Sequence, residues 1–68
     1  MEFKLKDQEY IQLTQLLKHL SLVGSGGEAF IRIDNGEVLV NGVTELQRRK
    51  KLRTGDIIQF DNQEIKIL

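Results

Sequence analysis

The residues best able to do chemistry form one short run in the second half of the chain. Of ten lysines and arginines, five fall within residues 48–53. They are Arg48, Arg49, Lys50, Lys51 and Arg53, here called the basic segment. Crowded like charges repel one another, and a small domain normally intersperses the two signs. Phosphates would relieve that repulsion and release counterions, so the basic segment predicts phosphate binding; the plainer alternative is a solvated loop with no specific role.

A second feature is Ser25-Gly26-Gly27-Glu28. Serine followed three residues later by glutamate is the capping-box arrangement that begins a helix. Two glycines in the first turn cost up to about 1 kcal/mol each relative to alanine. They also leave the helix N-terminus open to an anion such as a phosphate. The alternative is that the glycines allow tight packing of the turn before the helix, and the residues alone leave both interpretations open.

Catalysis and metal binding find little support in the sequence. His19 is the only histidine, and no serine or carboxylate has a spacing that suggests a partnership with it. The chain has no cysteine, which excludes a disulfide, a thiolate nucleophile and a cysteine-bound zinc. Asp56 and Asp61 are typical turn residues. We therefore expect no catalytic residue, no cofactor and no metal.

The four aromatic residues bear on how nucleic acid could be bound. Phe3, Phe30 and Phe60 lie in apolar patterns typical of a core, whereas Tyr10 fits either core or surface. A platform for stacking unpaired bases needs several exposed rings. The sequence thus favours recognition of shape and backbone in folded RNA.

The elements that position these residues follow from periodicity and turn signals. Alternation predicts a strand over 2–5, and Asp7 as N-cap with helical apolar spacing predicts a helix over 8–20. A second helix is expected over 26–34, ended by Asn35-Gly36. A strand over 38–40 ends at the turn Asn41-Gly42, and Thr54-Gly55-Asp56 is a further turn. Two strands, 57–60 and 64–68, form a hairpin around 61–63.

Composition bounds the class of protein. At 68 residues, with 40% hydrophobic and 29% charged residues, the chain is expected to form a single domain over 1–68 of α+β class. The formal net charge is zero, but the concentrated basic segment can still attract phosphates. The N-terminus alternates charged and apolar residues, and no run approaches the ~18 apolar residues of a membrane helix. We expect a monomeric cytoplasmic protein with no membrane partner.

Four segments occur in the order found in a known RNA-binding domain. They are Leu16-Leu17-Lys18, Ser25 to Ala29, Gly36 to Gly42, and Leu52 to Asp56. The chain resembles the alpha-L RNA-binding domain, named after small-subunit ribosomal protein S-four, over about residues 10 to 60. Within that family it is most similar to the small free-standing bacterial group of YaaA/YbcJ-like proteins, through Gly26-Gly27 with Ala29, Val40-Asn41-Gly42, Glu45, Arg48-Arg49, Lys51-Leu52 and Gly55-Asp56.

The resemblance implies an alpha-L fold, with two packed helices against a small, mostly antiparallel sheet. It also implies that RNA lies across the two helices and the basic segment, contacting Lys18, Ser25, Gly26, Gly27, Arg48, Arg49, Lys50 and Lys51. Arg53 belongs to the same basic segment, and Arg32 would extend the positive face if it projects to the same side. Asn41, Gly42, Gly55 and Asp56 match structural turn positions.

Three departures remove positive charge from the helices. Gln12-Leu13-Thr14 replaces an Arg-Leu-Asp pattern, Gly26 stands where an arginine is frequent, and Phe30 stands where the free-standing group commonly has lysine. Binding should therefore depend more on the basic segment, with Arg48 and Arg49 as the first choices for phosphate contacts.

The sequence thus predicts a non-catalytic protein that binds structured RNA, such as ribosomal RNA or another stable RNA. A protein-interaction adaptor that keeps the fold with little RNA affinity is the alternative. Salt separates the two, because affinity for RNA falls steeply as salt rises and a mainly apolar protein contact is much less sensitive.

Overall fold

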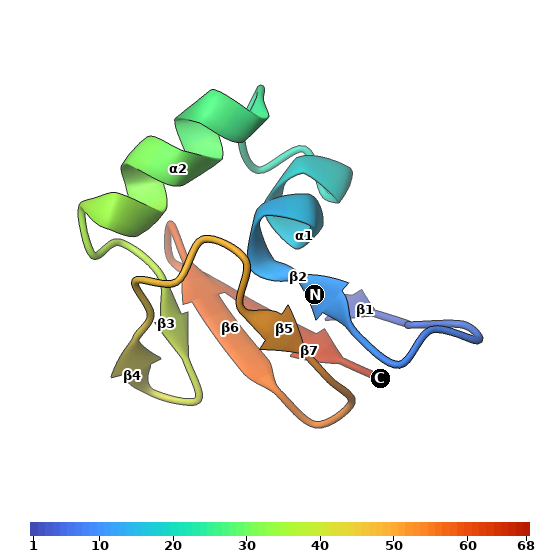
Figure 1. The fold of residues 1–68 in the computed structure, drawn as a ribbon. Helices are drawn as coiled ribbons and strands as arrows, with labels where there is room; N and C mark the ends of the chain where they lie inside the picture. The colour runs from blue at the N-terminus through green and yellow to red at the C-terminus, as the bar shows by residue number, and fades with distance from the viewer.

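Two helices and seven short strands make up the computed structural model, which describes residues 1–68 (Figure 1). The α+β class is confirmed. The elements in chain order are β1 (Glu2–Phe3), β2 (Ile11–Gln12), α1 (Leu13–His19), α2 (Gly26–Asp34), β3 (Leu39–Val40), β4 (Val43–Thr44), β5 (Lys51–Leu52), β6 (Ile57–Phe60) and β7 (Gln63–Ile67).

The strands form one main sheet and one separate ribbon. The main sheet has the order β1-β7-β6-β3-β4, in which only the β1–β7 pair is parallel. The ribbon is the antiparallel pair β2–β5, with Ile11 opposite Leu52 and Gln12 opposite Lys51. Figure 1 shows α1 and α2 side by side at one end of the main sheet, with β5 on the viewer's side of β6. The mostly antiparallel sheet beneath two packed helices is confirmed.

A single cluster of buried side chains joins these elements. Leu13, Leu16 and Leu17 of α1 have no exposed surface, and neither do Ile58 of β6 and Leu52 of β5. Burying a side chain of this size contributes about 1.5–3 kcal/mol. Leu52 matters for the site, because its burial holds the middle of the basic segment against the core.

The first helix begins later than the sequence predicts. The prediction of a helix over 8–20 with Asp7 as N-cap is wrong, because α1 spans Leu13–His19 and Gln12 is its N-cap. Lys6 and Asp7 instead have left-handed backbone conformations, with φ of 43° and 49°. Ile11 pairs with Leu52, forty-one residues away. That long-range pairing keeps the segment before Leu13 extended despite the helical spacing of its apolar residues.

The second helix and the turns agree closely with prediction. α2 spans Gly26–Asp34, and the Ser25 side chain accepts a hydrogen bond from the backbone N–H of Glu28 at 3.1 Å. Gly36 has a φ of +76° beyond its C-terminus. Asn41 and Gly42 both have positive φ values, 53° and 82°, as the tight β3–β4 hairpin requires.

Besides β2, which falls within the helix predicted over 8–20, two more strands escaped prediction. β4 follows the Asn41-Gly42 turn, but Val43 and Thr44 are both exposed, so no buried alternation marks it. β5 lies inside the basic segment, where Lys51 is exposed and Leu52 is buried. The last hairpin turns at Asp61-Asn62, and β7 therefore begins at Gln63 rather than Glu64.

The Asp56 carboxylate joins the end of the basic segment to the β3–β4 hairpin. One oxygen accepts a hydrogen bond from Asn41 Nδ2 at 2.9 Å, and the other accepts one from the backbone N–H of Arg53 at 2.8 Å. The Asn41 side-chain oxygen in turn accepts the Ile57 N–H at 2.9 Å. Asn41 and Asp56 are therefore structural turn residues, as the sequence predicts.

We expect Asp56→Ala to lower the free energy of unfolding by about 1–2 kcal/mol. The variant loses two hydrogen bonds and leaves both donors, Asn41 Nδ2 and the Arg53 N–H, without an acceptor. Urea denaturation of the two variants Asp56→Ala and Thr54→Ala measures this. Thr54 is exposed, makes no side-chain hydrogen bond and serves as the matched control. Equal stability of the two variants would contradict the structural role of Asp56.

Candidate nucleic-acid interface

Backbone hydrogen bonds fix the basic segment to the start of α1. The N–H groups of Leu13 and Thr14 donate to the carbonyl oxygens of Lys50 and Arg48, at 2.9 and 3.2 Å. The Thr14 hydroxyl also donates to the Arg48 carbonyl, at 2.5 Å. N–H groups in the first turn of a helix have no partner within that helix, and here the basic segment supplies one. Its side chains consequently project from a held backbone.

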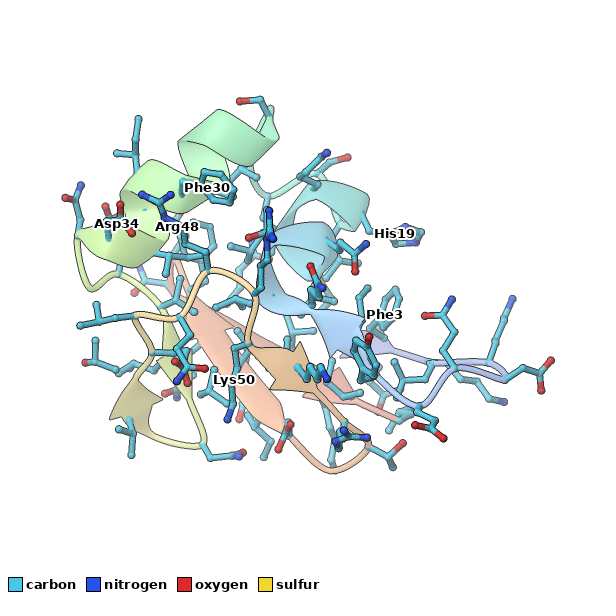
Figure 2. The ribbon with its side chains drawn as sticks, in the orientation of Figure 1. Phe3, His19, Phe30, Asp34, Arg48 and Lys50 are labelled. Carbon is cyan, nitrogen blue, oxygen red and sulfur yellow. The ribbon has the colours of Figure 1, made fainter.

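Arg48 is already engaged within the protein. Its Nε and Nη2 donate to the two carboxylate oxygens of Asp34, at 3.1 and 2.6 Å, and the guanidinium lies 4.5 Å from the ring centroid of Phe30. The hydrogen bond from Arg48 lowers the pKa of Asp34, and the same bond raises the pKa of Arg48. Figure 2 shows Arg48 against α2 beside Phe30 and Asp34. The Arg48 guanidinium, which the sequence predicts to bind phosphate, thus binds the Asp34 carboxylate in this structure.

This contact also corrects the prediction that Phe30 belongs to the core. Phe30 is only half-buried, and Arg48 covers its ring. Asp34 was missed by sequence reasoning, because fourteen residues separate it from Arg48 and no local pattern links the two.

Arg32 lies at the centre of a second set of carboxylates. Its guanidinium pairs with Glu37 at 2.7 Å, with Glu28 at 3.6 Å and with Asp61, and lies 4.6 Å from the Phe60 ring centroid. The hydrogen bond to Glu37 is the main cause that raises the pKa of Arg32. These contacts connect α2 to the β6–β7 turn and compensate the charge. The expectation that Arg32 extends the positive face is therefore corrected: its contacts are structural.

The other predicted cations are free of ion pairs. Every salt bridge of the chain involves Arg32 or Arg48. Arg49 is exposed and Lys50 half-buried. Figure 2 shows Lys50 directed away from the helices, whereas Arg48 lies against them. Lys51 and Arg53 are exposed and lie near the Tyr10 ring, with the Lys51 Nζ 5.0 Å and the Arg53 guanidinium carbon 5.6 Å from its centroid. Uncompensated positive charge is thus presented by four residues close together in the chain: Arg49, Lys50, Lys51 and Arg53.

The start of α2 is open. The Glu28 side chain accepts the Gly24 N–H at 2.8 Å, and the N–H groups of Gly26 and Gly27 have no partner in the protein. A Cβ on Gly26 would meet its nearest neighbour, Lys18 Cδ, at 3.9 Å, and one on Gly27 would meet Ser25 Oγ at 3.8 Å. Both are ordinary contacts, so tight packing does not explain the two glycines. Lys18 is exposed beside this helix terminus.

The remaining surface offers little for other chemistry. His19 is exposed, with its ring edge-on to Phe3 at a centroid distance of 5.2 Å (Figure 2). No three acidic, histidine or cysteine side chains gather as metal ligands do. The larger surface hollow, at β6 and β7, contains Glu37, Asp61 and Glu64 and no cation. Neither helix has the length and apolar character needed to cross a membrane.

Comparison with known proteins places this geometry in a family. The sequence matches the S4 domain family over residues 3–68. It is 38% identical over 55 residues to the probable ribosome maturation protein RlbA of Bacillus subtilis, covering 81% of this chain and 78% of that protein. It is 30% identical over 66 residues to the putative RNA-binding protein YbcJ of Escherichia coli, covering 97% of this chain and 94% of that protein.

A solved structure agrees with the sequence comparison. The solution structure of Escherichia coli YbcJ, described as having an alpha-L motif involved in RNA binding, superposes with a TM-score of 0.74 at 30% identity. The match covers 98% of this chain and 85% of that one. The resemblance seen in the sequence is thereby confirmed, and the chain belongs to the S4 domain family, in its YbcJ-like branch with the alpha-L fold.

Proposed function

We propose that this protein is a non-catalytic factor that binds structured RNA through the basic segment and the N-terminus of α2. The observation that carries the proposal is the set of unpaired cations at Arg49, Lys50, Lys51 and Arg53, on a backbone anchored to α1. A backbone held in this way loses less conformational freedom when its side chains bind phosphates. The relatives named for RNA binding and the YbcJ fold support the same reading.

The contacts divide between the two parts of this interface. Arg49 and Arg53 can pair bidentately with phosphates, and Lys50 and Lys51 add point charges. At the start of α2, the free N–H groups of Gly26 and Gly27 can donate hydrogen bonds to a phosphate, and Lys18 supplies a positive charge beside them. Ser25 caps the helix and so keeps this terminus in place. Arg48 joins the interface only if phosphate displaces Asp34.

Ribosomal RNA, within an assembling or mature ribosome, is the partner we propose first. RlbA, 38% identical to this chain, is named as a probable ribosome maturation protein. A folded protein of 68 residues with a positively charged surface is suited to recognise the shape and backbone of a stable RNA. We expect the protein to act as a monomer in the bacterial cytoplasm.

A protein-interaction adaptor is the second candidate function. It is favoured by the zero net charge of the chain. It is also favoured by Arg32 and Arg48, whose charges are paired with carboxylates of the same chain. In that case RNA affinity would be weak even at low salt. A mainly apolar contact with a protein would depend much less on salt than a contact with phosphates.

We predict that the double variant Arg49→Ala/Lys50→Ala loses about tenfold or more in affinity for a structured ribosomal RNA fragment. The slope of log K against log salt should become shallower by about two, because two phosphate contacts are lost. Fluorescence polarisation over a salt series measures both quantities. The control, Lys4→Ala/Lys6→Ala, removes equal charge from exposed lysines near the N-terminus. If the control loses as much as the double variant, binding is diffuse and the proposed interface is wrong.

Asp34→Asn should raise RNA affinity several-fold. The variant removes the carboxylate that competes with phosphate for the Arg48 fork, and one more contact should steepen the salt slope by about one. The same titrations compare it with Asp7→Asn, which deletes an equal charge at an exposed turn residue without an ion pair. Weaker binding by Asp34→Asn, with Asp7→Asn unchanged or tighter, would show that Arg48 serves RNA only through its bond to Asp34.

A further inference from the structure

The four aromatic rings differ in what covers them. Phe60 is buried beneath Arg32, and Phe30 lies beneath Arg48, and both arginines are held by carboxylates. Phe3 contacts His19. Tyr10 alone has cations near its ring that no carboxylate holds, namely Lys51 and Arg53. Tyr10 is therefore the ring whose cations a phosphate can draw away without breaking an ion pair.

The β2–β5 ribbon explains why these three side chains meet. Ile11 and Leu52 are paired and buried, so the residues beside them face the opposite, outer side. Lys51 precedes Leu52 in β5, Arg53 directly follows that strand, and Tyr10 directly precedes β2. The backbone of Arg53 is fixed by its hydrogen bond to Asp56. A half-buried ring and two free cations of the basic segment thus share one surface.

We propose that Tyr10, Lys51 and Arg53 form a binding site for an unpaired nucleotide that adjoins the structured RNA held by the rest of the interface. The base stacks on the Tyr10 ring, and Lys51 and Arg53, which lie over that ring in the free protein, move to the flanking phosphates. This inference rests on the proposed RNA-binding function and makes it more specific. The preferred RNA is then a helix with a single-stranded extension or bulge, rather than a plain duplex.

The chemistry of a nucleotide matches both parts of the site. Every base offers a π-face, so stacking on tyrosine needs no particular sequence. The cations exchange a weak contact with the ring for a stronger one with phosphate, and the ring exchanges cations for a base. If Tyr10 only stabilises the β2–β5 ribbon, a different result is expected. Its replacement would then change stability, or affinity for all RNA probes equally, and would show no dependence on an unpaired base.

Intrinsic fluorescence gives a direct test, because Tyr10 is the only tyrosine and the chain has no tryptophan. The probes are a short RNA hairpin with a single-stranded adenosine tail and the same hairpin with an abasic tail, which keeps the phosphates and lacks the bases. We expect the adenosine tail to quench Tyr10 emission on binding and the abasic tail to leave it nearly unchanged. Competition titrations of Tyr10→Leu and Tyr10→Phe accompany this, with circular dichroism to establish that each variant is folded.

Tyr10→Leu should lose about tenfold in affinity for the adenosine-tailed hairpin and almost nothing for the abasic one, whereas Tyr10→Phe keeps the stacking face and the affinity. Salt-sensitive binding of both hairpins without quenching, or an equal loss on both in Tyr10→Leu, would overturn the nucleotide site while leaving the RNA-binding function standing. If the native chain binds neither hairpin at low salt, the proposed function and this site fail together.

Discussion

The anchoring of the basic segment to the first turn of α1 is the constraint on which the rest of the site depends. The carbonyls of Arg48 and Lys50 take the N–H groups of Leu13 and Thr14, so a helix start and a charged loop satisfy each other. This contact sets where α1 begins and keeps the β2–β5 ribbon paired. It also fills the α1 N-terminus with protein carbonyls, which leaves the α2 N-terminus as the open one.

The positive charges of this small protein fall into two groups, those paired with carboxylates and those without an ion pair. Arg32 and Arg48 pair with carboxylates and cover Phe60 and Phe30, so they serve the packing of α2. The cations that follow Arg48 have no such partners. A chain with zero net charge can thus keep a local positive surface, because much of its negative charge lies around Arg32 and at the β6–β7 hollow.

Features set by neighbouring residues could be predicted from the sequence, and features set by distant ones could not. Ser25 and Glu28 fix the start of α2 locally, and Asn41-Gly42 and Gly36 fix their turns through backbone conformation. The start of α1 depends on the pairing of Ile11 with Leu52, and the state of Arg48 depends on Asp34. Tyr10 gave an ambiguous signal for the same reason: its neighbours are Lys51, in the other strand of the ribbon, and Arg53, directly after that strand.

The central claim is the location of the RNA interface, and an amide NMR titration with a structured ribosomal RNA fragment tests it most directly. The account predicts that the largest shifts fall on residues 48–53 and on Gly26 and Gly27, with Lys18 nearby. Residues of the β6–β7 turn, around Asp61, should move little, because carboxylates dominate that surface. Shifts centred on the β6–β7 turn, with the basic segment unchanged, would contradict the account.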